Sequence, residues 1–405
     1  MSTSIVYHLF GAKGYDYKKF ELNTGNGIRF KIERKRNEIK CPKCHSKQII
    51  FKGSVSRSLK AMPTGNYRSI YLDIKVHKIK CNECGSRLQE EIPILPTAKA
   101  HHTKQFEGMT CDLLKFATIK DVAEYTKMSW STIKGIDKRR LNREKPKIQL
   151  KDLQYIAVDE IYLGKNKKYK TIVIDLASGR IIYVGDGRGH EALKEFFKKI
   201  KKYKNNLKAV AMDMSGAYYS AVTKELEGVD VIFDRFHIVK LMNEKLDKIR
   251  REYQKSLFTD NKKVIKGKRY LLLKNPDKLK EDQKEELDKL LKLNTPLTTA
   301  YILKEDLRQL WEANSWDQGK IFLDNWIQKA IASGIKQLKI MANTLTKYKE
   351  GILNYFKHRM NIGILAGKRI SSARIEGVNN KIKRMLRMCY GLRDDTYLEL
   401  KLRCL

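Results

Sequence analysis

The alternation of apolar and polar residues predicts β-structure in the first quarter of the chain. Residues 1–100 alternate around two pairs of cysteines, and in the clearest stretch Ile70, Leu72, Ile74 and Val76 are separated by Tyr, Asp and Lys. A period of two predicts a strand with one buried face. This strand would run toward the second cysteine pair.

The apolar residues then change to the spacing of a helix. Residues 118–134 read TIKDVAEYTKMSWSTIK. Val122 would face the core of a first helix, and Ser129 is a good N-cap for a second helix that begins at Trp130. Two short helices at this spacing are typical of a helix-turn-helix. An ordinary helical hairpin with a basic face is the alternative.

The next region alternates strands and helices, and an acid follows three of its strands. The predicted strands cover 155–158, 170–176, 181–185, 209–212 and 229–233. Three antiparallel strands, a helix, a strand, a helix and a strand is the order of a ribonuclease H-like fold. Strands one and four are neighbours in that fold. Asp159 and Asp213, which follow these two strands, should therefore converge although they lie far apart in the sequence.

Residues 240–365 read as helical throughout, and a last helix is predicted near 372–389. The expected fold class is therefore α/β and multidomain. Its parts are a β-rich zinc ribbon (1–100), a helix-turn-helix domain (101–148), the first part of a ribonuclease H-like mixed-sheet core (149–239), an all-α insertion (240–365) and the C-terminal part of the core (366–405).

The charge of the chain indicates the kind of partner that it binds. The formal net charge is +38, far more than solubility requires, so a polyanion such as DNA or RNA is expected. The alternative is a solvated basic surface like that of a ribosomal protein. A membrane partner is not expected, because the sequence shows neither a signal peptide nor an apolar run long enough to span a bilayer. The expected location is the cytoplasm.

Four of the seven cysteines form two Cys-x-x-Cys pairs, Cys41 with Cys44 and Cys81 with Cys84. Two such pairs supply four thiolates, which suits a structural zinc ion with no open position. Redox-active pairs are the alternative interpretation, and His45 is a weaker candidate ligand.

Converging carboxylates suit in-line displacement at a phosphodiester, where hard cations stabilise the attacking and leaving oxygens. Magnesium prefers such oxygen ligands, so Asp159 and Asp213 are candidate ligands for Mg²⁺ or Mn²⁺. Spacing leaves the third acid open between Glu244, close after the fifth strand, and Glu376, which opens the last helix.

The predicted second helix of the helix-turn-helix carries polar and basic residues suited to the major groove and to phosphates. The candidate DNA-binding residues are Thr132, Lys134, Lys138, Arg139 and Arg140.

Taken together, the chain resembles the ISL3 family of bacterial insertion-sequence transposases over nearly its whole length. The resemblance is carried by VDEIYLGKNKKYKTIVIDLASGRIIYVGDGR, AVAMDMSGAYYSAV, VIFDRFHIVKLMNE and SARIEGVNNKIKRMLRMCYGLRD. It implies that Asp159, Asp213 and Glu376 are the metal-binding triad. It also implies an Asp-x-x-His element at Asp234 and His237. His237 would contact the scissile phosphate or orient a triad residue, and a histidine that merely opens a helix is the equal alternative.

The resemblance implies a DDE transposase that binds terminal inverted repeats, cuts DNA with magnesium and joins the freed end to target DNA. Pairing two ends implies a homodimer or a larger assembly on DNA, associated with the nucleoid. A DNA-binding regulator with an inert core and a structure-specific nuclease are the alternatives.

Overall fold

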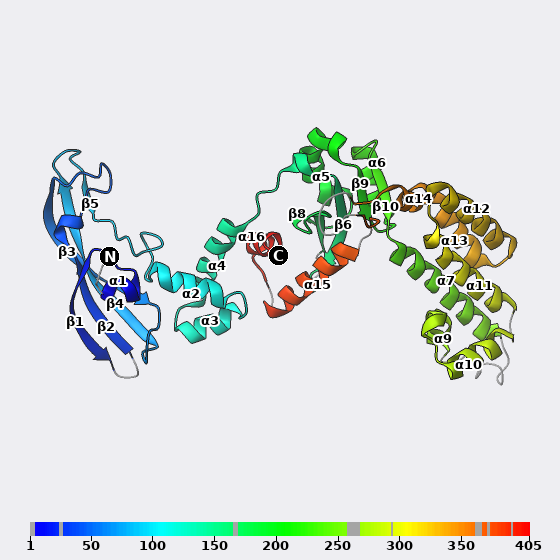
Figure 1. Ribbon diagram of the computed structural model, residues 1–405, viewed down its shortest axis with the longest axis horizontal. Helices are drawn as coiled ribbons and strands as arrows, with labels where there is room; N and C mark the ends of the chain where they lie inside the picture. Colours follow the sequence, from blue (N-terminus) through cyan, green and yellow to red (C-terminus); the bar gives the residue numbers. More distant parts are fainter. Residues whose placement is uncertain are drawn as a thin grey trace. The chain divides into compact units, whose positions relative to one another are not determined.

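The computed structural model describes residues 5–23, 27–164, 169–256, 268–292, 295–360, 367–370, 373–389 and 392–405 (Figure 1). The chain divides into two compact units. The N-terminal unit comprises Met1–Lys145 with Leu386–Arg393, and the C-terminal unit comprises Pro146–Met385 with Asp394–Leu405. Among the helices of these ranges, none has the length and hydrophobicity needed to cross a membrane.

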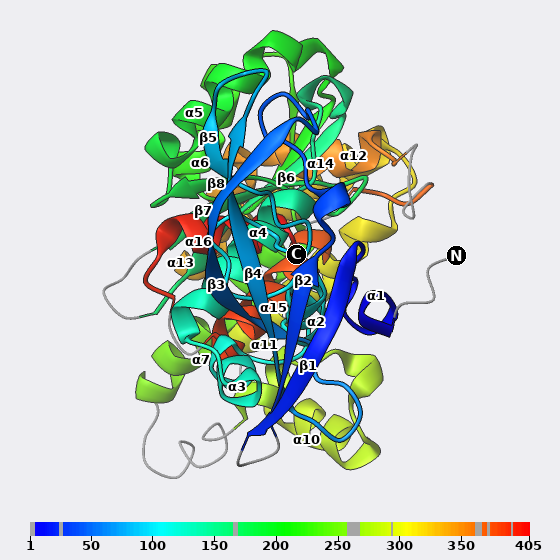
Figure 2. The same ribbon diagram turned by 90° about the vertical axis from the view of Figure 1, so that its left-hand side faces the viewer.

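The N-terminal unit is built on a five-stranded sheet, seen face-on in Figure 2. Its order is β1-β2-β4-β3, and β5 pairs with β4. The bounds are β1 Tyr15–Asn23, β2 Gly27–Arg34, β3 Ile49–Ala61, β4 Ser69–Cys81 and β5 Arg87–Gln89, with a short helix α1 at Ile5–Phe10. The alternating positions Ile70, Leu72, Ile74 and Val76 are all buried, so the period-two prediction is confirmed.

Three helices complete this unit: α2 Lys104–Leu113, α3 Ile119–Thr126 and α4 Trp130–Glu144. Thr118 and Asp121 form a capping box at the start of α3. The Ser129 side chain accepts a hydrogen bond from the Thr132 amide, as predicted for an N-cap of α4. Val122, Ile133 and Ile136 share a small buried core between α3 and α4.

The C-terminal unit contains a mixed sheet in the order β10-β9-β6-β7-β8. Its strands are β6 Tyr155–Tyr162, β7 Tyr169–Asp175, β8 Ile181–Asp186, β9 Ala209–Met212 and β10 Asp230–Phe233. The two connecting helices are α5 His190–Ile200 and α6 Gly216–Glu225. Strands β6 and β9 are parallel neighbours, which confirms the predicted adjacency of strands one and four.

One strand differs from its prediction. β6 continues past Val158 to Tyr162, so Asp159 lies inside the strand and not at its end. The reason is the antiparallel ladder with β7, which runs from Ile156 to Tyr162, whereas pairing with β9 stops at Ala157.

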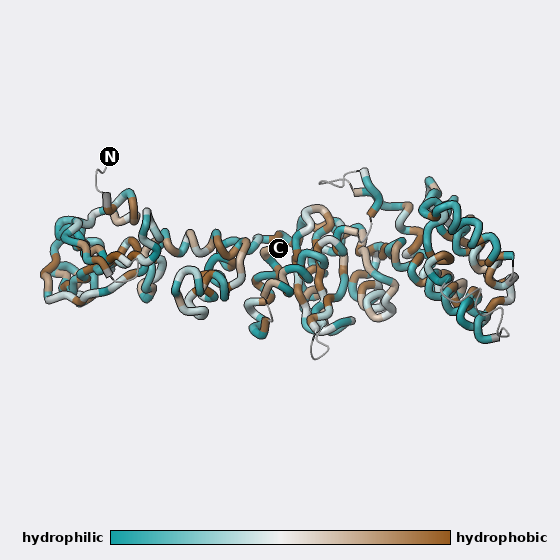
Figure 3. The backbone as a smooth tube through the Cα atoms, turned by 90° about the horizontal axis from the view of Figure 1, so that it is seen from below, coloured by the Kyte–Doolittle hydropathy of each residue, from teal (hydrophilic) through white to brown (hydrophobic). Residues whose placement is uncertain are grey.

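A helical block follows β10, and Figure 3 shows its helices as mainly hydrophilic with hydrophobic stretches. It begins with α7, which starts at Arg235. The bounds are α7 Arg235–Ser256, α9 Arg269–Leu273, α10 Glu281–Lys292, α11 Thr295–Gln309, α12 Trp316–Ala332, α13 Lys336–Lys347 and α14 Lys349–Lys357. Short 3-10 helices lie at Arg36–Glu38, Leu150–Asp152, Lys201–Asn206, Pro276–Lys278 and Leu310–Glu312.

Helix α14 returns the chain to the sheet by packing on the edge strand β10. The Asn354 side chain donates to the Val231 carbonyl at 3.1 Å. A Cβ at Gly351 would lie 2.4 Å from the Phe233 ring, so this approach requires glycine. Two further helices, α15 Ala373–Met388 and α16 Asp395–Arg403, complete the chain.

Candidate active site and metal centre

The four cysteines of the two Cys-x-x-Cys pairs meet at one point. One ligand atom from each of Cys41, Cys44, Cys81 and Cys84 lies within 4.8 Å of the others. Tetrahedral zinc with bonds of about 2.3 Å to sulfur requires sulfur separations of about 3.8 Å. The Sγ atoms of Cys41 and Cys84 are 3.6 Å apart, and those of Cys44 and Cys81 are 3.5 Å apart. The cluster therefore fits a structural zinc ion.

The two turns that carry these thiols have the same backbone hydrogen bonds. The Cys41 amide donates to the Ser46 carbonyl at 2.9 Å, and the Cys81 amide donates to Ser86 at 3.0 Å. His45 and Gly85 hold the corresponding positions, with φ of 59° and 67°. His45 therefore serves the turn geometry, and the ligand group contains the four cysteines without it.

The sheet of the C-terminal unit brings the acids of three strands to one level. Ala157 of β6 pairs with Ala211 of β9, so two residues further on Asp159 comes level with Asp213. Met212 pairs with Phe233 of β10, so Asp213 comes level with Asp234. The parallel register thus explains how acids far apart in the sequence are brought together.

Asp159 has a strongly shifted pKa. Burial, reinforced by the negative charge of Asp213, raises the pKa of Asp159 to about 6. Two hydrogen bonds oppose this shift, from the Glu160 amide at 2.7 Å and from the Asn379 side-chain amide at 2.6 Å. The charged form of Asp159 therefore needs a positive partner.

His237 supplies positive charge to the neighbouring acid. Its Nδ1 lies 2.9 Å from an oxygen of Asp213 and 3.6 Å from one of Asp234. The contact with Asp213, with Asp234 second, raises the pKa of His237 to about 9. This contact is what an orienting role for His237 requires.

Helix α15 is fixed beside these acids at two points. The Arg374 guanidinium donates to the carbonyls of Leu176 and Ala177 at 2.7 and 3.0 Å, over the turn between β7 and β8. One and a half turns later Asn379 donates to Asp159. Glu376 lies between the two anchors, in the first turn of the helix, and its side chain is exposed.

The predicted third acid thus lies on the helix that contacts Asp159, but it does not join a ligand cluster. Among the residues that the structure describes, the four cysteines form the one group of three or more potential ligands. Glu244, the alternative third acid, lies in α7. Asn379 was not among the candidates. It could have been found from the buried stripe, because it falls on the helix face of Ile375, Val378 and Ile382, all of them buried.

On α4, the five candidate DNA-binding residues divide into two sets. Arg139 donates to the buried Glu107 at 2.5 Å. Arg140 donates to the buried Asp137 and to Glu144, each at 2.7 Å. Arg139 therefore joins α4 to α2, whereas Arg140 pairs with acids of its own helix.

The other three candidates lie toward the start of the helix or on another of its faces. The Lys134 ammonium lies 5.2 Å from the Trp130 ring centroid. Thr132 shares a hydrogen bond with Ser129 at 2.8 Å. Lys138 and Lys134 are both half-buried.

The cysteine cluster predicts about one zinc ion per chain in the purified protein. Cys41→Ser and Cys84→Ser should lose the metal and unfold the surrounding strands, whereas Cys404→Ser, outside the cluster, should retain it. Elemental analysis with thiol titration measures both. Absence of zinc together with seven reactive thiols in the folded protein would contradict the assignment.

The raised pKa of Asp159 predicts that the stability of the metal-free protein decreases as the pH rises. Because its pKa is raised to about 6, the stability that its protonated form provides is complete below about pH 4 and lost as the pH rises through 6. Asp159→Asn should therefore raise the melting temperature at pH 8, by roughly 2–4 °C for each kcal/mol relieved, and have little effect at pH 4. Thermal unfolding at both pH values measures this.

Magnesium should raise the melting temperature of the unmodified protein at pH 8 and not that of Asp159→Asn. Glu244→Gln is the control and should keep the magnesium effect. Equal melting temperatures for Asp159→Asn and the unmodified protein at pH 8, with and without magnesium, would rule out this account of the acid pair.

Comparisons with known proteins match the chain to transposases. The family model for the DDE transposases of the ISL3 group, described as "Transposase", matches residues 156–402. The transposase for insertion sequence element IS1001 of Bordetella parapertussis is 29% identical and aligns over 100% of this chain and 98% of its own length. The transposase for IS1557 of Mycobacterium tuberculosis is 26% identical over 92% of this chain and 87% of its own.

A solved structure, the Drosophila P element transposase strand transfer complex, covers 74% of this chain and 90% of its own, with 13% identity and a TM-score of 0.36. A likeness this distant carries no structural argument. The family match spans more than half of the chain, including Asp159, Asp213, His237 and Glu376. The chain belongs to the ISL3 family of insertion-sequence DDE transposases.

Proposed function

We propose that this transposase binds the terminal inverted repeats of its element, cuts one strand at each end and joins the freed 3′ hydroxyl to target DNA. The observation that carries the proposal is the register of β6 and β9, which sets Asp159 level with Asp213. Two hard oxygen ligands on adjacent strands suit a divalent cation at a phosphodiester.

The acids fit magnesium, with manganese as the alternative. The half-buried Asp159 and its neighbour Asp213 repel each other, so a cation between them would remove the cost of their charges. Asp159, Asp213 and Glu376 would hold the metal. When bound, magnesium stabilises the charge that develops on the attacking and leaving oxygens.

Two other side chains would position the ligands. Asn379 holds one oxygen of Asp159, leaving the carboxylate a fixed orientation. His237 holds Asp213 from the other side and places a positive charge at the edge of the site. Arg374 fixes the start of α15, the helix from which Glu376 would approach the metal.

Recognition of the element ends is assigned to the N-terminal unit. Its zinc-binding strands and the helix-turn-helix formed by α3 and α4 supply two DNA-reading elements. Within α4, Thr132 and Lys134 lie near the helix start, where base edges are read, and Lys138 lies further along, where phosphates are contacted. The net charge of +38 supports double-stranded DNA as the partner.

Transposition requires two element ends to be brought together, so the acting form is proposed to be a homodimer or a larger assembly on DNA. A strand-transfer assay separates this function from its alternatives. A regulator would leave DNA intact, a nuclease would only cut it, and a transposase would join it. The location that follows is the cytoplasm, at the nucleoid.

The triad predicts that Asp159→Asn, Asp213→Asn and Glu376→Gln each abolish magnesium-dependent nicking and strand transfer on a labelled element end. Each amide keeps the shape of the side chain and removes the charge that the cation needs. Double variants should be no worse than single ones, because the three acids act as one unit. DNA binding, measured by anisotropy, should persist in all of them.

Glu244→Gln is the matched control, because sequence spacing alone makes Glu244 an equal candidate for the third metal ligand. Full nicking activity of Glu376→Gln, together with loss of activity in Glu244→Gln, would contradict the assignment of Glu376 as the third metal ligand. Activity of all three triad variants would exclude the DDE mechanism.

The two sets of basic residues on α4 predict different defects. Lys138→Ala should weaken binding to DNA of any sequence. It should also reduce the slope of log affinity against log salt concentration by about one. Arg140→Ala should instead destabilise the helical domain, on the order of 2 kcal/mol, because Asp137 is fully buried. Fluorescence anisotropy over a salt series and thermal unfolding distinguish the two. The same salt slope in Lys138→Ala and the unmodified protein would remove Lys138 from the interface.

A further inference from the structure

Phe236 is an exposed aromatic residue beside the acids of the C-terminal unit. Its side chain is 58% exposed, although it lies between Asp234 and His237 at the start of α7. The ring centroids of Phe236 and His237 are 5.6 Å apart, and the two rings are nearly perpendicular, at 87°. Because His237 contacts Asp213, one aromatic ring separates Phe236 from a proposed metal ligand. An apolar ring is therefore exposed to water at the edge of the site.

The first turn of α7 holds the Phe236 ring in this exposed position. The Phe236 amide donates to a side-chain oxygen of Asp234 at 3.1 Å, and the His237 amide donates to the Asp234 carbonyl at 3.2 Å. The face of α7 that packs into the core consists of Ile238, Met242, Leu246 and Ile249. Phe236 lies away from this face, so the packing of the helix keeps its ring outward. A ring that is already held in place loses little conformational freedom when it binds a ligand.

Two cations adjoin Phe236 in α7. Arg235 precedes it, and Lys240 follows one turn later, at the spacing that places two side chains on one face of a helix. Both cationic side chains are exposed, and among the described residues neither forms an ion pair. A surface that combines an aromatic ring with unpaired positive charge is suited to the bases and phosphates of a nucleic-acid strand.

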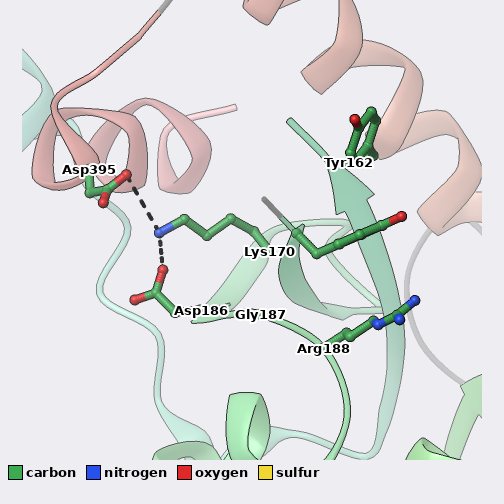
Figure 4. Close-up of a pocket in the computed structure, with 7 residues that line it drawn as sticks. Tyr162, Lys170, Asp186, Gly187, Arg188 and Asp395 are labelled. Atoms are coloured by element: carbon green, nitrogen blue, oxygen red, sulfur yellow. Dashed lines mark hydrogen bonds and ion pairs between the residues drawn. The ribbon is translucent and has the colours of Figure 1, made fainter. Parts of the chain in front are cut away.

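Lys170 of β7 differs from these two cations, although it lies on the face of the sheet that carries Asp159. Its ammonium lies between the carboxylates of Asp186 and Asp395, and the contact to Asp395 is 3.8 Å (Figure 4). The charge of Lys170 is therefore already neutralised within the protein. The two cations of α7 keep their charge for a phosphate, which favours a DNA strand as the partner of the exposed ring.

We propose that Phe236 stacks on an unpaired DNA base next to the scissile phosphate, and that Lys240 holds a neighbouring phosphate of the same strand. In a paired duplex both faces of each base are covered by neighbouring bases, so the ring selects a base that has left the stack. A base held there would fix the strand end relative to Asp159 and Asp213. The inference rests on the proposed function, because it takes the scissile phosphate to lie at these two acids.

The test uses the full chain and duplexes of the element end that differ at one nucleotide, placed on either side of the cleaved bond. That nucleotide is paired, unpaired through a mismatch, or an abasic sugar. At one of the two positions the unmodified protein should bind the unpaired form about 5- to 150-fold more tightly than the abasic form, the range expected for one stacked base. Fluorescence anisotropy without magnesium, which leaves the DNA uncut, measures the affinities.

Phe236→Ala should remove this preference and leave affinity for the abasic form unchanged. Phe236→Trp should keep the preference, because the new ring also stacks, whereas Phe236→Leu should lose it. Tyr270→Ala removes a ring of α9 that is 76% exposed, and as the matched control it should keep the preference. Lys240→Ala should lower affinity for all forms of the duplex and reduce the slope of log affinity against log salt concentration by about one.

Equal binding of the unpaired and abasic forms by the unmodified protein at both positions would overturn the inference. A preference that survives Phe236→Ala would also overturn it, as would an equal loss of affinity for both forms in that variant, which a purely structural role of the ring would produce. A smaller assembly of Phe236→Ala in sedimentation, with no preference in the unmodified protein, would assign the ring to a contact between chains. Failure to nick any duplex when magnesium is added, with the preference intact, would instead contradict the proposed function.

Discussion

The arrangement of this protein depends on two carboxylates held level on adjacent parallel strands. The register of β6 and β9 places Asp159 beside Asp213 in a partly buried position, where each charge raises the cost of the other. A fold does not gain stability from such a pair. The surrounding contacts from Asn379 and His237 offset part of this cost.

These contacts come from parts of the chain that are far apart in the sequence. His237 follows β10 and approaches Asp213, whereas Asn379 arrives on α15 and approaches Asp159. Between them lies the helical block, which α14 ties back to β10 through Asn354. The helical block is compatible with the site because its last helix, α14, packs on the sheet before α15 begins.

Much of this could be predicted from the sequence, because it depends on local patterns. The alternation around Leu72, the Ser129 cap and the strand ending at Met212 each reflect neighbouring residues, and the structure has them as predicted. The four cysteines also meet, since two close pairs can bind one ion from two turns. The Arg139 pair with Glu107 could not be predicted, because the two residues come from different helices. The full length of β6 was missed for a similar reason, since its ladder with β7 extends it past Asp159.

The third acid remains the least local element. Glu376 lies between the two anchors of its helix, Arg374 and Asn379, and we propose that DNA and metal draw its exposed carboxylate in as the third ligand. Anomalous diffraction from crystals of the full chain with Mn²⁺ and a DNA end tests this most directly. The account predicts manganese bound by Asp159 and Asp213, with Glu376 turned toward it. Manganese bound elsewhere, or no manganese between the two aspartates, would contradict it.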